Sequence, residues 1–370
     1  MRLCLFIGHH KVGSTTLQDF LWRNAARLLE AGILYPAVES EGLARLARQI
    51  QTGEEPDPVP MNAREAHNAL AFRMLHEAVA YPIPPWHPNL PGVAQMGQTI
   101  ASQIRSFAPR TVILCAEVFA NFGALAPGLI GDLSGFFEGA EVSLHCTLRR
   151  PDQYLASWHG QRLRFGARLE PLRKGGLAPY LGTIHADYRL MLEPWIEGFP
   201  RARLSLRNYA EVLAAGGSVA DFLSEARLDL PPAVATRLLP ERRSNESLHP
   251  ALLEFARAGA LRLPPPAAAQ LTGALLTPLP RLNLPPKDEI ELFGRANRRR
   301  LLDAFRGSDG WLRARRGRPF FPALAAMAEP LPRPEPEVAR ALRPALAAAL
   351  AEGGHPAALA RFVETLEIAA

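Results

Sequence analysis

The chain opens with a pattern that predicts a strand, a tight loop and a helix. Leu3–Ile7 is an almost unbroken apolar run, which is typical of a strand that is covered on both faces of a parallel sheet. Apolar residues between positions 17 and 28 then recur at helical spacing, and Gly32 stands where a helix commonly ends. The polar loop between them, Gly8–Thr16, therefore joins the end of a buried strand to the start of a helix.

The same alternation of strands and helices continues along the chain. Further short apolar runs predict strands at 33–36, 111–117, 142–148 and 203–207. Helical spacing predicts helices at 63–80, 97–107, 125–137, 154–164, 219–226, 251–260 and 289–305, with Ser218 placed to cap the helix at 219–226. Such an order favours the α/β class, with a central, mainly parallel sheet between two layers of helices.

Two segments depart from this alternation. Residues 37–95 are polar and proline-rich with one amphipathic helix, and we interpret them as an insert that forms either a lid over a binding site or a plain surface excursion. Residues 329–337 contain four prolines and read as a linker. They precede an alanine-rich helical pair at about 337–366. We therefore expect one α/β domain at 1–328 and a helical extension at 329–370 that packs or oligomerises.

The composition of the chain says more about its cellular location than about its function. The formal net charge of +6 comes almost wholly from arginine, since the 370 residues include only three lysines. We attribute the arginine usage to genome composition and do not predict a nucleic-acid partner; a basic surface fits an anionic cofactor or an acidic acceptor equally well.

The three cysteines fall in predicted strands, no apolar run is long enough to span a membrane, and a core strand starts at residue 3. These features predict a cytoplasmic protein with reduced thiols, without a signal peptide or stable membrane insertion.

The loop after the first strand has the composition of an anion cradle. Gly8 and Gly13 keep the glycine spacing of the phosphate-binding pattern G-x-x-x-x-G-K-[ST], and Thr15 keeps its last hydroxyl. Ser14 occupies the lysine position, whereas the lysine lies three residues earlier, as Lys11. Loop amides, the helix N-terminus and this lysine would all direct positive charge at one ligand. An ordinary glycine-serine turn remains the alternative.

Two motifs, one at Lys11–Thr16 and one at Arg149–Ser157, resemble motifs that occur in the same order in the sulfotransferases that use 3′-phosphoadenosine 5′-phosphosulfate (PAPS). The segment from Lys11 to Thr16, KVGSTT, resembles their 5′-phosphosulfate loop K-x-G-[ST]-[ST], and the longer string GHHKVGSTTLQ…GILYP resembles the bacterial branch. The segment from Arg149 to Ser157, RRPDQYLAS, resembles their 3′-phosphate motif R-x-P-x-x-x-x-x-S. The resemblance covers mainly residues 1–36, 108–166 and 200–255.

The resemblance implies a P-loop-like three-layer α/β/α fold and a role for each matching residue. Lys11 would neutralise the leaving diphosphate, while Arg149 and Ser157 would hold the 3′-phosphate from two sides. The residues that would cradle the 5′-phosphosulfate are Gly13, Ser14, Thr15 and Thr16.

A third segment, at residues 243–248, resembles a stretch that follows the cofactor pocket in bacterial relatives. Its side chains Arg243, Asn245 and Ser247 would close over the 3′-phosphate. In a second interpretation Asn245 or Ser247 simply caps the helix that follows.

Transfer of a sulfuryl group to a hydroxyl also needs a base. Glu117 ends a predicted strand where cytosolic relatives carry a histidine, so it is the candidate; alternatively it pairs with Arg149 or Arg150. Lys11, Glu117 and Arg149 each stand at or just past the carboxyl end of a predicted parallel strand, so they could converge on one crevice. His9 and His10 could also approach the acceptor, although a role in shaping the loop is favoured. His145, in the middle of a strand, is expected in the core.

We therefore predict a PAPS-dependent sulfotransferase that works by in-line displacement without a metal ion. The acceptor is a small molecule or a glycan, with a glycan or glycolipid suggested by the bacterial resemblance alone. A P-loop kinase or nucleoside triphosphatase, in which Glu117 would serve a bound Mg²⁺, and a catalytically silent nucleotide-binding relative are the alternatives.

Overall fold

A computed structural model describes the chain except residues 55–56, 243–246, 278, 280–281 and 370. The residues divide into two compact units. The first unit comprises 1–149 and 188–244, and the second comprises 150–187 and 245–370. This division falls at positions other than the proline-rich segment near residue 329.

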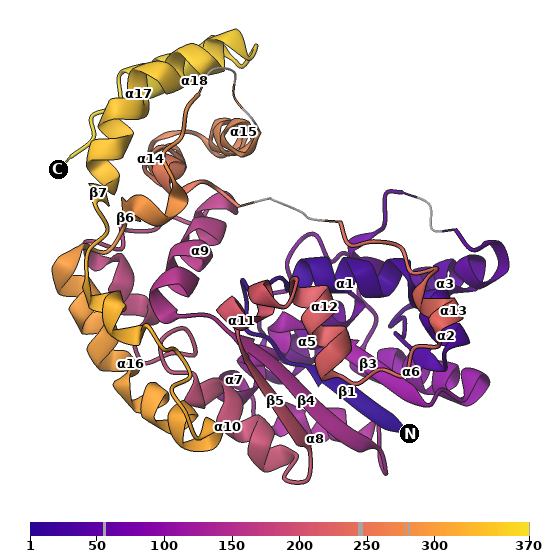
Figure 1. The fold of residues 1–370 in the computed structure, drawn as a ribbon. Helices are drawn as coiled ribbons and strands as arrows, with labels where there is room; N and C mark the ends of the chain where they lie inside the picture. Colours follow the sequence, from indigo (N-terminus) through magenta and orange to yellow (C-terminus); the bar gives the residue numbers. More distant parts are fainter. Residues whose placement is uncertain (55–56, 243–246, 278, 280–281, 370) are drawn as a thin grey trace. The chain divides into compact units, whose positions relative to one another are not determined.

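The first unit is built on a five-stranded parallel sheet (Figure 1). Its strands are β1 (Arg2–Phe6), β2 (Ile33–Leu34), β3 (Thr111–Cys115), β4 (Glu141–Leu148) and β5 (Arg203–Asn208), in the order β2-β3-β1-β4-β5. All four pairings are parallel, with Leu3 opposite Val112 on one side and Val142 on the other. The predicted α/β class with a central parallel sheet is thus confirmed. The central place of β1 puts the loop that follows it in the middle of the sheet's carboxyl edge.

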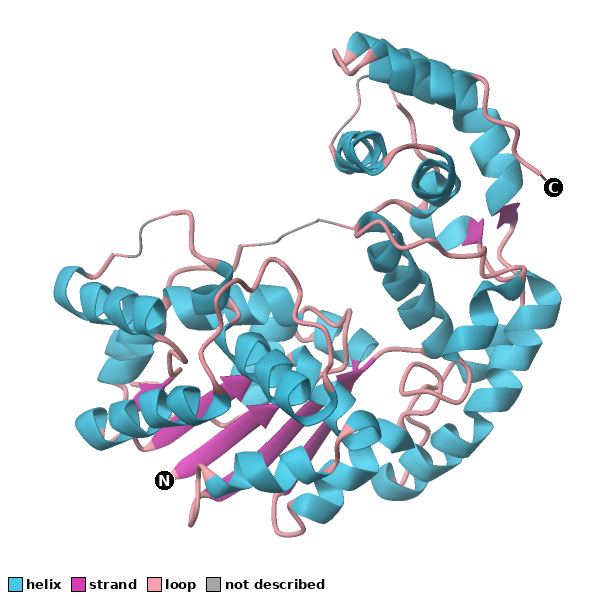
Figure 2. Ribbon diagram, turned by 180° about the vertical axis from the view of Figure 1, so that it is seen from behind, coloured by secondary structure: helices cyan, strands magenta, loops and turns pink. Residues whose placement is uncertain are grey.

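Helices connect these strands on both faces of the sheet. In sequence order they are α1 (Ser14–Arg23), α2 (Ala25–Glu30), α3 (Ser40–Thr52), α4 (Met61–Arg64), α5 (Ala66–Val79), α6 (Val93–Phe107), η1 (Glu117–Asn121), α7 (Phe122–Leu125), α8 (Gly128–Gly135), α10 (Arg189–Gly198), α11 (Tyr209–Ala214), α12 (Ser218–Glu225) and α13 (Pro232–Ala235). Figures 1 and 2, which view the sheet from opposite sides, show α1 and α12 over one face and α5 and α8 over the other. The core between them explains the unbroken apolar run of β1, because Leu3 and Leu5 are completely buried.

The second unit is largely helical. Its elements are α9 (Pro151–Arg164), η2 (Gly175–Tyr180), η3 (Pro250–Leu252), α14 (Leu253–Arg262), α15 (Pro265–Leu276), η4 (Lys287–Glu289), β6 (Ile290–Glu291), α16 (Gly294–Arg316), η5 (Leu324–Ala328), β7 (Arg333–Pro334), α17 (Glu335–Glu352) and α18 (Ala357–Glu364). The predicted alanine-rich helical pair is confirmed as α17 and α18, which pack against each other.

The segment that was predicted to be a linker is folded into this unit. Arg333–Pro334 pairs with Ile290–Glu291 as a short parallel ladder. Glu335 then begins α17 and is completely buried, with its carboxylate 2.7 Å from the Arg173 guanidinium and 3.1 Å from that of Arg257. The linker interpretation is wrong because the prolines precede or start a helix, where their missing N–H groups are not needed.

Two further helices, α3 and α15, were not predicted from the sequence because their segments are rich in charged residues or proline. In the insert at 37–95, where one helix was predicted, the structure adds the 13-residue α3. Its N-cap is Glu39, which accepts hydrogen bonds from the amides of Glu41 at 2.7 Å and Gly42 at 2.6 Å. Glutamate is not among the residues preferred at this position. Helix α15, which starts at Pro265 in a run of three prolines, was not among the predicted helices.

Candidate functional site

The loop between β1 and α1 has a backbone that only glycine can provide at two positions. Gly8 and Gly13 have φ angles of +110° and +88°. A Cβ atom on Gly8 would lie 3.1 Å from the Ala120 Cβ, and one on Gly13 would lie 2.9 Å from the Ser218 Oγ. Both glycines of the phosphate-binding pattern are therefore required by conformation and by space.

The loop is fixed to the neighbouring strand β4 beyond the end of β1. The amide of His9 donates to the Thr147 carbonyl at 2.8 Å, and the amide of Thr147 donates to the Gly8 carbonyl at 2.9 Å. After these bonds the chain turns through Lys11, whose φ is +62°, and enters α1 at Ser14. Gly13 stands at the N-cap and has no side chain to satisfy the first amides of the helix. This ten-residue helix therefore presents uncapped N–H groups on the loop side.

Ser218 stabilises this loop and is not the helix cap that the sequence predicted. Helix α12 starts after Gly217, and the Ser218 hydroxyl donates instead to the Gly13 carbonyl at 3.0 Å. The cap prediction failed because the hydroxyl has a partner that is distant in sequence. This hydrogen bond fixes the last turn of the loop to a residue that is 205 positions away in the sequence.

Glu117 lies directly against the loop. It follows β3 after one residue and begins η1, and its carboxylate accepts a hydrogen bond from the Ser14 hydroxyl. The pKa of Glu117 is raised from 4.5 to about 8, mainly by burial; the negative charge of Glu65 contributes to this rise, and Lys11 opposes it. Glu117 is therefore mostly protonated at neutral pH and becomes a carboxylate in mildly alkaline solution.

A second carboxylate reaches this region from the insert, and sequence reasoning missed it. The Asn68 side chain, on α5, donates to Glu65 at 3.1 Å and accepts from the Val118 amide at 3.4 Å. Glu65 also accepts from the guanidinium of Arg64 at 3.0 Å. This chain of hydrogen bonds holds the turn that carries Glu117. The sequence signal for this arrangement is weak: Glu65 and Asn68 are polar residues three positions apart in a segment that is otherwise rich in alanine and leucine.

Arg149 reaches the same loop from the end of β4. Its guanidinium donates to the Lys11 carbonyl at 3.5 Å and lies 5.1 Å from the centre of the Tyr209 ring. The Tyr188 hydroxyl donates to the Arg149 carbonyl at 2.6 Å. The two tyrosines, which position this arginine, were not predicted from the sequence. The structure thus brings together Lys11, Glu117 and Arg149, three residues expected to converge because each follows a parallel strand.

The structure does not test the other predicted ligands of the 3′-phosphate as partners of Arg149. Ser157 and Ser247 belong to the second unit, so their pairing with Arg149 stays a prediction. Ser247 is exposed, and its predicted capping role is wrong because the His249 side chain accepts from the Ala251 amide at 3.2 Å. Arg243 and Asn245 lie outside the described residues.

The histidines of the first unit shape the structure around the loop. His9 is completely buried, its Nδ1 accepts from the His10 amide at 2.7 Å, and its ring lies 5.3 Å from that of Tyr188. His145 is confirmed in the core, where burial lowers its pKa to about 3.

The cysteines, Cys4, Cys115 and Cys146, are buried free thiols in β1, β3 and β4.

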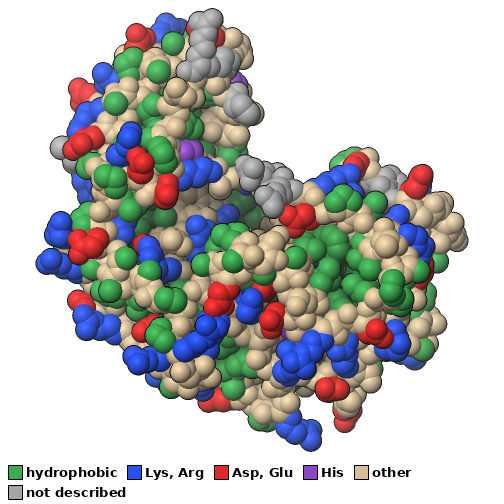
Figure 3. Space-filling model, in the orientation of Figure 1, with side chains coloured by type: hydrophobic (Ala, Val, Ile, Leu, Met, Phe, Trp, Pro, Cys, Tyr) green, Lys and Arg blue, Asp and Glu red, His purple; other side chains and the backbone are tan. Residues whose placement is uncertain are grey.

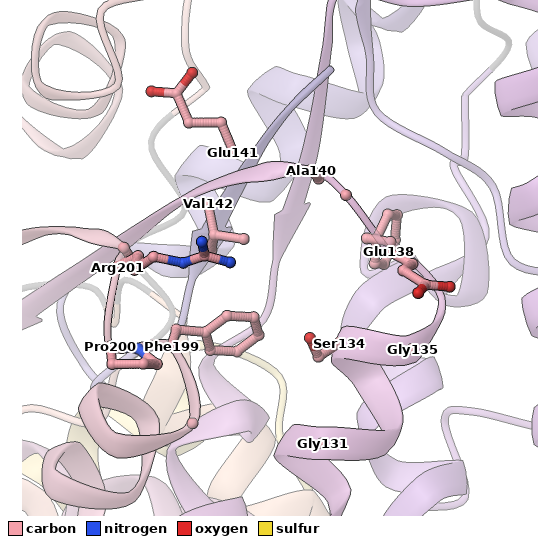
Figure 4. Close-up of a pocket in the computed structure, with 14 residues that line it drawn as sticks. Gly131, Ser134, Gly135, Glu138, Ala140, Glu141, Val142, Phe199, Pro200 and Arg201 are labelled. Carbon is pink, nitrogen blue, oxygen red and sulfur yellow. The ribbon is translucent and has the colours of Figure 1, made fainter.

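A hollow of about 780 Å³ occupies the opposite, amino edge of the sheet. It is lined by the start of β4 together with residues that precede β5, and Figure 4 shows Ser134, Phe199 and Arg201 around it. Because Lys11 and Arg149 stand at the carboxyl edge, this hollow is separate from the loop.

Two kinds of feature are absent from the described residues. Within them, no three histidine, cysteine or acidic side chains are grouped as metal ligands would be. In the same residues, no helix combines the length and apolar character needed to cross a membrane. The chain matches no protein-family model, no curated protein and no solved structure.

Proposed function

We propose that the protein is a PAPS-dependent sulfotransferase with a P-loop-like three-layer fold, which moves a sulfuryl group to an acceptor hydroxyl. The observation that carries this proposal is the convergence of Lys11, Glu117 and Arg149 on the Gly8–Thr16 loop. Two cations and a helix N-terminus beside one carboxyl group suit a polyanionic donor and an acceptor that must lose a proton.

The loop fits such a donor in both shape and charge. Gly8 and Gly13 let the loop pack closely against Ala120 and Ser218, which holds its backbone in the turned conformation of the phosphate-binding pattern. Lys11 would neutralise the leaving diphosphate, and the amides from Gly13 to Thr16 would bind the 5′-phosphosulfate. Arg149 would bind the 3′-phosphate, and the further ligands in this proposal are Ser157, Arg243, Asn245 and Ser247.

Glu117 would act as the general base. The donor supplies the sulfuryl group: the acceptor oxygen–sulfur bond forms, the bond to the bridging phosphate oxygen breaks, and 3′,5′-diphosphoadenosine leaves. Glu117 takes the acceptor proton, and it must be ionised to do so. Since burial raises its pKa to about 8, transfer should become faster as the pH rises through this value. A pH–rate profile that is flat between pH 6 and 9 would contradict this role.

One observation favours a second candidate, a P-loop kinase or nucleoside triphosphatase. The Ser14 hydroxyl and the Glu117 carboxyl are hydrogen bonded, and a hydroxyl beside an acid is also how such enzymes hold Mg²⁺. The missing lysine after Gly13 weighs against this candidate. A catalytically silent relative would bind nucleotide and lose no turnover in Glu117→Gln.

Calorimetric binding of 3′,5′-diphosphoadenosine, compared with Mg²⁺·ADP, tests the proposal. We expect metal-free binding of the diphosphate that weakens at least tenfold in Arg149→Ala, a loss of about 1.4 kcal/mol or more. The exposed Arg201, at the opposite edge of the sheet, provides the control Arg201→Ala. Preference for Mg²⁺·ADP would refute the sulfotransferase and favour the kinase. Unchanged sulfuryl transfer in a folded Lys11→Ala variant would refute the role of that lysine.

A further inference from the structure

The positive charge of the chain is concentrated in one helix of the second unit. Helix α16 contains eight arginines and two aspartates, a net charge of +6. The formal net charge of the whole chain is also +6, so the remainder is neutral. A basic balance that seemed to be a matter of overall composition is therefore local. Figure 3 shows Lys and Arg side chains along the surface of this helix, whose course Figure 1 gives.

One face of α16 accounts for its packing. Leu301, Phe305 and Leu312 recur along this face and are completely buried. Arg298 is buried on the same face, where Glu291 at 2.6 Å and Asp152 at 3.3 Å compensate its charge. The large apolar residues of the helix are thus used in the core, and its exposed face is left to charged and small residues.

Four of the six exposed arginines of α16 form a nearly straight row. Arg295, Arg299, Arg306 and Arg313 are all exposed, and they are four, seven and seven residues apart. At about 100° per residue these positions fall within about 40° of one another, and the row extends about 27 Å along the helix axis. We name these four residues the arginine row. Between them, at similar angles on the helix, lie the half-buried Leu302 and Asp309 and the exposed Gly310.

Two members of the arginine row have weak partners. Arg295 lies 3.6 Å from Glu329 and Arg306 lies 3.1 Å from Asp303, and all four of these side chains are more than half exposed. Exposed ion pairs of this kind contribute little and are screened by salt. An anionic ligand can replace them.

We propose that the arginine row binds a linear, sparsely charged polyanion, namely an acidic polysaccharide with sulfate or carboxylate groups. A single row of arginines matches a linear polymer better than a flat charged surface. Guanidinium groups bind sulfate and carboxylate groups in a bidentate manner. Over about 27 Å, duplex DNA presents about 16 phosphates to four arginines, whereas a polysaccharide carries one acidic group every one or two sugar rings. Insertion into a lipid surface would need the apolar face that α16 uses in the core.

Binding of chondroitin sulfate, which carries one sulfate and one carboxylate per two sugar rings, to the full chain tests this proposal, without donor and independently of any transfer activity. The test variant is Arg299→Gln/Arg306→Gln/Arg313→Gln. The control, Arg48→Gln/Arg105→Gln/Arg361→Gln, removes three exposed arginines from other helices and gives the same net charge. Thermal unfolding of both variants verifies that each is folded.

We expect the wild type to bind chondroitin sulfate with an affinity that falls steeply with salt, with a log–log slope of about −3 to −4 for four contacts. In the test variant the slope should fall toward about −1, and the affinity in 50 mM NaCl should fall at least ~10-fold, while the control keeps both. Equal losses in the two variants, or no binding in 50 mM NaCl, would overturn the proposal. Tighter binding of a 20-base-pair duplex or of phosphatidylserine vesicles would overturn it in favour of that partner.

Discussion

Replacing Glu117 by Gln should stabilise the protein in alkaline solution and have little effect in acid. The amide keeps an oxygen that accepts the Ser14 hydrogen bond, and it resembles the protonated carboxyl group that the folded protein prefers. The folded-state pKa of about 8 lies above the ordinary value of 4.5. Between these values the folded state holds a proton that the unfolded state has released. Stability is therefore lost as the pH rises from about 4.5 to about 8.

The size of this effect follows from the two pKa values. Their difference of about 3.5 corresponds, as a ceiling, to about 5 kcal/mol at pH 9 and to about 0.8 kcal/mol at pH 5. Urea unfolding of the wild type and Glu117→Gln at pH 5, 7 and 9 measures the change. Because the chain has two units, each transition is analysed separately. Glu197→Gln, at an exposed position in the first unit, is the control. A stability difference that is the same at pH 5 and pH 9, or a variant less stable at pH 9, would refute the reasoning.

Three further substitutions test other parts of the structure. Gly13→Ala should destabilise the first unit by about 1–3 kcal/mol, since it combines a positive φ with a close approach to Ser218; an unchanged urea midpoint would contradict this. Glu65→Gln should lower the pKa of Glu117, measured by carbon NMR of the labelled carboxyl group, whereas a purely structural role would leave it unchanged. Glu335→Ala leaves two arginines without their buried carboxylate and should cost about 3–5 kcal/mol in urea unfolding; a loss below 1 kcal/mol would refute it.

The centre of the fold and the core of the site were predictable because both depend on local pattern. An unbroken apolar run predicts a buried strand, and parallel strands place their carboxyl ends at one edge. Lys11, Glu117 and Arg149 were therefore expected to meet, and the structure brings them to one loop.

The parts that were missed depend on contacts between distant segments. Asn68 and Glu65 support Glu117 only because α5 packs against η1, which no periodicity records. Ser218 looked like a local cap and binds a carbonyl 205 residues away. Glu335 lies among prolines that suggested a linker, yet two arginines hold it in the core.

The bond between Ser218 and the Gly13 carbonyl also has a consequence for synthesis of the chain. The loop residues leave the ribosome long before Ser218, because the hydroxyl that fixes the last turn of the loop follows β5, the final strand of the sheet. Contacts between such distant residues form late, because the intervening chain must first be ordered. A nascent chain that stops before residue 218 would contain the whole loop sequence without its finished shape. Ligand binding by this loop would then report completion of the first unit rather than the presence of its N-terminal motif.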